Sequence, residues 1–174
     1  MNKICWKSLF VAILICAVFF VLTGCSESPA LDEVYESDYY TVEYSSQWNK
    51  DEMEHLGILD AVSFYFEEDN ELQSIGIIVE DNVFVSPDQY LAVEELEMML
   101  SDFELRKQES VELNEYEAEK LIYSSYIAAR EIIFYQVATV KDNIGYVLTF
   151  SVMRENEEQL LPSFEQVLKS FQLK

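Results

Sequence analysis

The sequence predicts an α+β fold in which a mostly antiparallel sheet of about six to seven strands is flanked by helices. Short segments rich in aromatic and β-branched residues, typical of strands, recur along residues 38–174. Two segments with apolar residues at helical spacing interrupt and close this series. Strands, a helix, further strands and a final helix form the order expected of an antiparallel sheet covered by helices.

Residues 1–24 carry the features of a secretory signal peptide. Lys3 and Lys7 make the start positive, and residues 8–21 form an almost entirely apolar run. A positive start, an apolar core and small residues at the exit are typical of an export signal. We therefore expect the domain that follows to be extracytoplasmic.

Leu22, Thr23, Gly24 and Cys25 close the apolar run and resemble the bacterial lipobox. Small residues at positions 23 and 24 let the backbone enter a peptidase site, and the Cys25 thiol is the nucleophile that accepts the lipid. We expect anchoring in the cell membrane through acyl chains on Cys25, palmitate among them, since stable anchoring needs two or more chains. The alternative is an uncleaved anchor with Cys25 unmodified, which also leaves the domain outside.

The predicted division is a signal peptide at 1–24, lipidated Cys25 with an acidic flexible tether at 25–37, and one domain at 38–174. The tether is polar and contains Pro29. Its twelve residues after Cys25 would span at most about 40 Å. The 150 residues that follow the signal peptide have the length of one ordinary domain.

Acidic side chains dominate the charge. The signal peptide contains two lysines and no acids, so its removal leaves nine Lys and Arg against 33 Asp and Glu. Such a chain is not expected to bind nucleic acid, whose phosphates require Lys and Arg. Cys5 and Cys16 leave with the signal peptide and Cys25 carries lipid, so no disulfide is expected within the domain.

The first half of the domain is predicted to contain a strand, a turn and a hairpin. Residues 39–44 alternate as a strand does, and Trp48 follows in a turn, where we expect it to plug the core at the sheet edge. Residues 61–67 and 74–80 predict the two strands of a hairpin.

A helix is predicted from Ser86 to about Asp102. Ser86 can cap it, Pro87 suits the first helical position, and Gln89 completes a capping box. Four apolar residues fall on one stripe that should face the core: Val93, Leu96, Leu100 and Phe103.

A meander of strands and a final helix complete the prediction. The strands are expected at 104–113, 116–126, 131–141 and 145–153, with turns at Asn114-Glu115 and Asp142-Asn143. The strand at 145–153 is the most apolar and is expected to be central. Asn156 should cap a helix that ends at Phe171, and Pro162 should begin its main part because proline breaks a helix interior. The apolar face of that helix comprises Phe164, Val167, Leu168 and Phe171.

This order of elements resembles the PsbP-like (Mog-type) α/β/α sandwich, and is similar in particular to small bacterial lipoproteins of that fold, the DcrB-related group among them. The resemblance is carried by residues 40–44 with Trp48, 113–118, 145–150 and 164–171. Two positions depart from the pattern. Ser46 stands where proline is common before the Trp turn, and Glu115 stands near the usual glycine.

The resemblance implies a non-enzymatic binding or assembly module. In photosystem II, proteins of this fold bind a membrane complex near a metal–calcium site. No matching ligand motif occurs in this sequence, so no metal-binding residue is carried over.

Catalytic motifs are not found in the sequence. It contains no G-x-S-x-G elbow, P-loop, dinucleotide fingerprint or C-x-x-C. His55 is the only histidine and is expected to be a surface residue. The acidic residues at 67–71 could bind calcium, but the D-x-D-x-D-G spacing is missing. We therefore predict no catalytic residue, no metal ligand and no cofactor.

The expected function is that of a membrane-anchored lipoprotein acting as a non-enzymatic binding or assembly module of the cell envelope. Its partners would be the membrane, through the lipid on Cys25, and an envelope protein. Tyr123, Tyr126 and Tyr135, at strand ends, are candidates for an exposed partner surface, with core packing as the alternative. The alternative function is a hydrolase acting on envelope material through carboxylates or His55.

Replacing Cys25 tests the lipid anchor. We expect radiolabelled palmitate to be incorporated into the wild-type chain and to be lost in Cys25→Ala, because only the thiol can accept the lipid. Cys16→Ala should keep the label, because Cys16 precedes the cleavage point. Label that survives in Cys25→Ala would show that the lipobox assignment is wrong.

Overall fold

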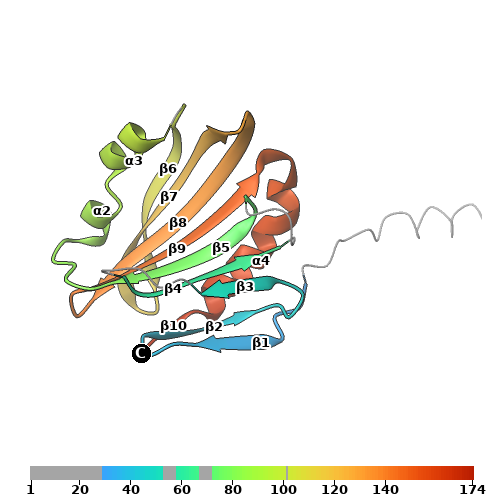
Figure 1. Cartoon of the computed structure of the whole chain (residues 1–174). Coiled ribbons are helices and arrows are strands. Elements are labelled where there is room, and N and C mark those ends of the chain that lie inside the picture. Colours follow the sequence, from blue (N-terminus) through green and yellow to red (C-terminus); the bar gives the residue numbers. More distant parts are fainter. Residues whose placement is uncertain (1–28, 53–57, 67–71, 101) are drawn as a thin grey trace, which may run out of the picture.

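The computed structural model describes residues 29–52, 58–66, 72–100 and 102–174 (Figure 1). The strands are β1 Glu33–Glu36, β2 Tyr40–Tyr44, β3 Asn49–Glu52, β4 Ile58–Tyr65, β5 Ser74–Glu80, β6 Glu104–Leu113, β7 Tyr116–Ile127, β8 Arg130–Lys141, β9 Ile144–Met153 and β10 Gln172–Leu173. The helices are α2 Pro87–Tyr90, α3 Val93–Met99, a 3₁₀ turn at Arg154–Asn156 and α4 Glu157–Ser170.

The apolar strand β9 lies at the centre of a seven-stranded antiparallel sheet of order β3-β4-β5-β9-β8-β7-β6. Its Leu148 pairs with Ile77 on β5 and with Val137 on β8, and all three side chains are fully buried. The predicted central position of this strand is confirmed, as is the hairpin of β4 and β5.

Tight turns connect the strands of the meander. Asn114 and Glu115 form the turn between β6 and β7, and Asp142 and Asn143 form the turn after β8. All four residues have positive φ. Asn and Asp tolerate this region better than most residues, and the predicted turns are confirmed. Ala128 and Ala129 join β7 to β8 with φ of 50° and 63°. Alanine has no preference for positive φ, so local sequence did not indicate this turn.

The assignment of residues 33–36 to a flexible tether is wrong, because they form strand β1. This strand pairs antiparallel with β2, and β10 pairs with the other side of β2 to make a second, three-stranded sheet. The ring of Tyr35 lies 5.8 Å from that of Tyr40 and 6.1 Å from that of Phe64. Tyr35 is half-buried against these rings, and this packing orders a segment whose acidic composition had suggested a tether.

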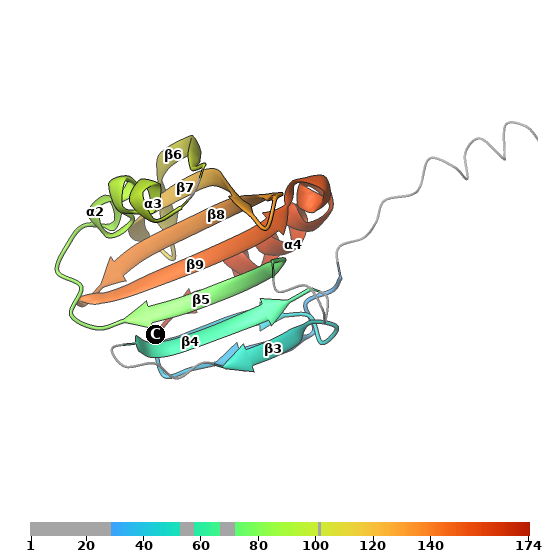
Figure 2. The same ribbon diagram turned by 45° about the horizontal axis from the view of Figure 1, so that its top comes forward.

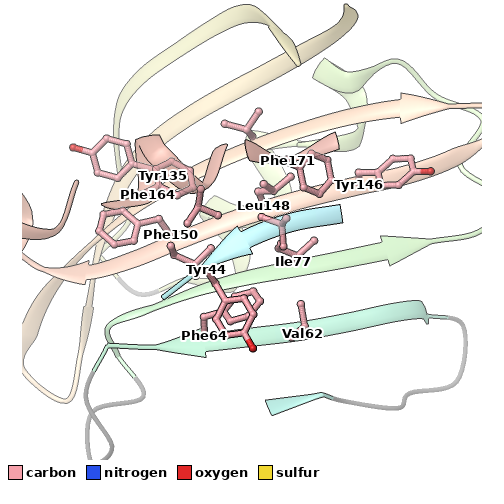
Figure 3. Packing of buried hydrophobic residues seen from close by; sticks show 14 of the residues in the cluster. Tyr44, Val62, Phe64, Ile77, Tyr135, Tyr146, Leu148, Phe150, Phe164 and Phe171 are labelled. Atoms are coloured by element: carbon pink, nitrogen blue, oxygen red, sulfur yellow. The ribbon is translucent and has the colours of Figure 1, made fainter. Parts of the chain in front are cut away.

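The main core lies between the seven-stranded sheet, the small sheet and α4 (Figure 3). The rings of Phe150 on β9 and Phe164 on α4 stack at 5.2 Å with an interplanar angle of 9°. Phe164, Val167 and Phe171 are buried, and Leu168 is partly buried against the same cluster. The predicted apolar face of the final helix is therefore confirmed.

Two details of α4 differ from the prediction. Pro162 does not begin the helix but lies inside it. Its missing N–H would have bonded the carbonyl of Glu158, which is on an exposed residue, where water can reach it. Asn156 occupies the N-cap position without making a side-chain cap, because its amide is bonded elsewhere.

The helix predicted at 86–102 is two short helices, α2 and α3, on the sheet face opposite α4 (Figure 2). Pro87 begins α2 as predicted, and the Ser86 N–H donates to Gln89 Oε1 at 3.4 Å. In one straight helix Leu91 would lie about 140° away from Leu96. The break turns Leu91 inward, where it is 6% exposed and belongs to a small core. All four residues of the predicted stripe are partly buried against this core, so the prediction that the stripe faces a core is confirmed.

The side chain of Asn114 ties the β6–β7 turn to the end of the chain. Its Nδ2 donates to the carbonyl of Phe171 and its Oδ1 accepts from the N–H of Leu173, both at 2.7 Å. We expect Asn114→Ala to lower the free energy of unfolding by about 2 kcal/mol more than Asn143→Ala, since it removes two hydrogen bonds. Asn143 shares the positive φ, but its side chain makes no hydrogen bond within the described residues. Equal losses in chemical denaturation would contradict this role.

Buried tyrosines predict a loss of stability in alkali. Burial raises the pKa of Tyr40, Tyr90, Tyr123 and Tyr135, and a hydrogen bond to Glu33 raises the pKa of Tyr44 to about 12. A raised pKa in the folded state stabilises the protein below the unfolded value of about 10. We therefore expect the free energy of unfolding to fall as the pH rises above about 10, with tyrosinate absorbance appearing together with unfolding. Complete tyrosine ionisation at an unchanged circular dichroism spectrum would contradict this expectation.

Candidate functional site

A pocket of about 280 Å³ opens at the end of the core where β4 and β9 end and α4 begins. We call it the amide pocket. It is lined by Pro29, Gln47, Trp48, Phe66, Gln73, Asn156, Gln159 and Leu160. Four of these eight side chains end in an amide group.

The turn between β2 and β3 positions the aromatic wall. The Trp48 N–H donates to the Ser45 carbonyl at 3.0 Å, and the Gln47 N–H donates to Ser45 Oγ at 3.3 Å. This turn directs Trp48 inward, where its ring meets that of Phe66 edge-on at 4.8 Å and is 6% exposed. The prediction that Trp48 plugs the core at this place is confirmed.

Gln73 and Asn156 form the buried floor. Phe66 N–H donates to the Gln73 carbonyl at 3.2 Å, and Asn156 Nδ2 donates to Gln73 Oε1 at 2.7 Å. Gln73 is 1% exposed, yet its Nε2 finds no partner among the described residues. A buried unpaired N–H costs about 1–3 kcal/mol, and this group is also shielded from solvent in the pocket.

None of the lining residues that the structure describes is charged, although the chain has a formal charge of −22; the acidic residues between Phe66 and Gln73 lie outside the described ranges. One of the two acids that flank Asn156 in sequence is engaged elsewhere. Glu157 accepts from Tyr135 Oη at 2.5 Å and from Arg154 at 3.2 Å, with Arg106 at 3.8 Å. Burial, and then the hydrogen bond to Glu157, raise the pKa of the Tyr135 hydroxyl.

The chemistry that these groups offer is recognition. Amide groups donate and accept hydrogen bonds without titrating, and the eight lining residues in the described part of the chain include no carboxylate, imidazole or thiol. Within the described ranges, no three or more His, Cys, Asp or Glu residues gather in a way that could hold a metal ion. No helix of the described part is long and apolar enough to cross a membrane.

Most residues that the sequence singled out lie outside the described ranges. These are Leu22, Thr23, Gly24, Cys25, His55 and the acidic residues at 67–71. The acids at the other end of the β4–β5 hairpin are engaged locally. Glu80 accepts from the Tyr90 hydroxyl at 2.6 Å, and Asp81 accepts from the Asn82 N–H at 2.8 Å.

The candidate tyrosine surface is mostly core. Tyr123 and Tyr135 are 3% and 6% exposed, so for these two residues the alternative of core packing is the one that the structure shows. Tyr123 stacks on Phe134 at 4.9 Å, which accounts for its burial. Tyr126 alone of the three is exposed, at 51%.

The sequence analysis missed the four amide residues of the pocket. Gln47, Gln73 and Asn156 come from three separate parts of the chain, and no motif connects them. One local feature could have indicated these residues, because each of the three lies beside the end of a strand or the start of a helix. Only the antiparallel arrangement of the strands brings them together.

Three solved structures share this architecture. A cyanobacterial PsbP, CyanoP from Synechocystis sp. PCC 6803, aligns with a TM-score of 0.61 and 14% identity over 88% of this chain and 99% of its own. LpqN of Mycobacterium tuberculosis, involved in cell envelope biogenesis, aligns with a TM-score of 0.52 and 14% identity over 87% of each chain. A Pseudomonas aeruginosa protein of unknown function, PA94, aligns with a TM-score of 0.51 and 14% identity over 79% of this chain and 94% of its own.

The chain has the PsbP-like α+β fold, which confirms the predicted fold class and the resemblance in fold. At 14% identity this likeness establishes the fold alone. No protein-family model matches the chain, and no curated protein matches it in sequence.

Proposed function

We propose that the chain is a membrane-anchored, extracytoplasmic binding or assembly module of the cell envelope, held by lipid on Cys25. The observation that carries this proposal is the position of Pro29. It lines the amide pocket only four residues after Cys25. Four residues span at most about 14 Å, so a lipid on Cys25 would hold this end of the domain beside the membrane.

The fold supports a role in the envelope. LpqN, which has this fold, is involved in cell envelope biogenesis, and a PsbP protein is among the other neighbours. None of the three neighbours described above is named for an enzymatic activity. These likenesses favour a binding or assembly role over catalysis.

The amide pocket also supports binding rather than hydrolysis. A carboxylate-dependent hydrolase needs paired acids around its substrate, and among the described residues the eight that line the pocket include none. The alternative of a hydrolase that uses His55 would need that residue at a pocket, and His55 lies outside the described residues.

A protein partner would find its apolar contacts near α2 and α3. Phe84, Met98 and Met99 are 73%, 80% and 79% exposed. Phe and Met are enriched at protein interfaces. This surface supports the proposal that an envelope protein is a second partner besides the membrane.

The anchored orientation can be measured with one label on α4 and one in the turn after β8. Strand β8, which also contacts the 3₁₀ turn before α4, has twelve residues and spans about 40 Å. Glu158→Cys lies near the amide pocket and Asp142→Cys lies at the far turn, and both positions are exposed. We expect a fluorophore at 158 to be quenched strongly by headgroup-labelled lipid in vesicles that carry the lipidated chain, and a fluorophore at 142 to be quenched weakly.

The two variants control for each other, because they differ only in position and the chain has no other free thiol once Cys25 is lipidated. Equal quenching of both labels, or stronger quenching at 142, would contradict the proposed orientation.

A further inference from the structure

The hairpin of β7 and β8 projects from the sheet. Strand β6 begins opposite Ser124, and β9 ends opposite Ile132. The hairpin therefore extends past both of its flanking strands, and we call residues 126–130 the hairpin tip. In Figure 1 this tip lies at the upper end of β7 and β8, whereas the β8–β9 turn lies at their lower end.

The hairpin tip is exposed and almost entirely apolar, in a chain with a strong negative charge. Tyr126 is 51% exposed and Ile127 is 37% exposed. Ala128, Ala129 and Arg130 are exposed as well. Exposed apolar side chains that gather at one projection are typical of a surface that meets a partner.

The backbone of the tip makes its two alanines unusual. Ala128 and Ala129 have φ of 50° and 63°, close to the 54° and 62° of Asp142 and Asn143 in the β8–β9 turn. Asn and Asp adopt this region more easily than alanine does. The chain therefore forms one conformation with polar residues at the far end of the sheet and with apolar residues at the tip. Apolar residues at the tip do not favour the turn itself, but they leave it without polar side chains.

Arg130 gives the tip one positive charge. Its Nη1 donates to Met153 Sδ at 3.6 Å, and it forms no ion pair with any residue that the structure describes. The adjacent acid, Glu131, is already engaged. It accepts from Arg106 Nη2 at 2.6 Å and lies 3.7 Å from Arg154 Nε. The tip thus presents a guanidinium group beside two exposed apolar side chains.

The tip lies at the same end of the sheet as Pro29. Pro29 lines the amide pocket, which opens where β9 ends and α4 begins. Strand β9 ends opposite Ile132, close to the start of β8. A lipid on Cys25, four residues before Pro29, would hold this end of the sheet beside the membrane. The surface that faces the tip would then be phospholipid.

We propose that the hairpin tip inserts shallowly into the phospholipid surface, with Tyr126 and Ile127 below the head groups and Arg130 on a lipid phosphate. Tyrosine is enriched where a membrane meets water, and guanidinium binds phosphate through paired hydrogen bonds. The inference rests on the proposed function, because the lipid on Cys25 brings this end of the domain to the membrane. The negative field of the domain would oppose an unanchored approach to an anionic surface.

The test uses the full lipidated chain in phosphatidylcholine vesicles whose lipids carry a quencher high on the acyl chain. A fluorophore is attached at Ala128→Cys, which keeps the Cβ of the alanine. We expect it to be quenched severalfold more strongly than fluorophores at Asp142→Cys and Glu158→Cys. Asp142 is the matched control, since it is also the first residue of a two-residue turn and its φ differs by only a few degrees. Equal acyl-chain quenching at 128 and 158 would overturn the insertion.

Further substitutions in the chain labelled at 128 test the side chains. Tyr126→Thr with Ile127→Thr should lower the acyl-chain quenching severalfold and keep the melting temperature, because both residues are exposed and threonine suits a strand. Arg130→Gln should lower the quenching by a smaller factor. Phe84→Thr is the control, since Phe84 is 73% exposed but follows β5 at the far end of the sheet. Unchanged quenching in the double variant, or an equal loss in Phe84→Thr, would contradict the proposed contact.

Head-group quenching at 158 and 142 separates this inference from the proposed function, because it does not depend on insertion. Strong head-group quenching at 158 without acyl-chain quenching at 128 would overturn the hairpin contact and leave the anchored module intact. Quenching at 128 that appears only when the vesicles contain other membrane proteins would assign the tip to a protein partner, and would also overturn the lipid contact.

Discussion

Burial of β9 on both of its faces is the constraint on which the rest of the structure depends. Alternate residues from Tyr146 to Val152 face the core beneath α4, and Val147 faces the smaller core beneath α2 and α3. Two apolar faces require cover on both sides, so the helices divide between them (Figure 2). The fit is close, because a Cβ at Gly145 would approach the Tyr90 ring to 2.6 Å. A side chain at this position would displace α2 from the sheet.

The amide pocket lies where this layered core ends. Stacking of Phe150 on Phe164 closes the apolar interior beside the start of α4. Beyond it, Gln73 and Asn156 bond to each other instead of to a charged group. The pairing of two neutral amides lets the core end without a buried charge, whose desolvation would be costly. It also leaves the Gln73 Nε2 group without a hydrogen-bond partner among the described residues.

Sequence patterns predicted those elements that depend on interactions between residues close together in the chain. The turn at Asn114 could be predicted because Asn adopts positive φ easily, whereas the equivalent turn at Ala128 could not. The apolar stripe on α4 could be predicted because its residues have helical spacing. The start of the helix was predicted at the wrong residue because of Pro162, which lies inside the helix. A proline in the sequence argues against a helix interior, but the hydrogen bond that it cannot make costs less where the freed carbonyl can bond to water.

Residue patterns along the chain were enough to predict the central strand, the hairpin, the meander and the apolar face of the last helix, because each depends on the periodicity of neighbouring residues. The lipobox-like segment of the sequence is also the basis for the proposed location of the protein at the membrane. Three features became visible only in the folded chain: residues 33–36 form a strand, the helix after β5 breaks at Leu91, and the four amide side chains line one pocket. These features depend on contacts between distant segments, and such contacts leave no periodic trace along the chain.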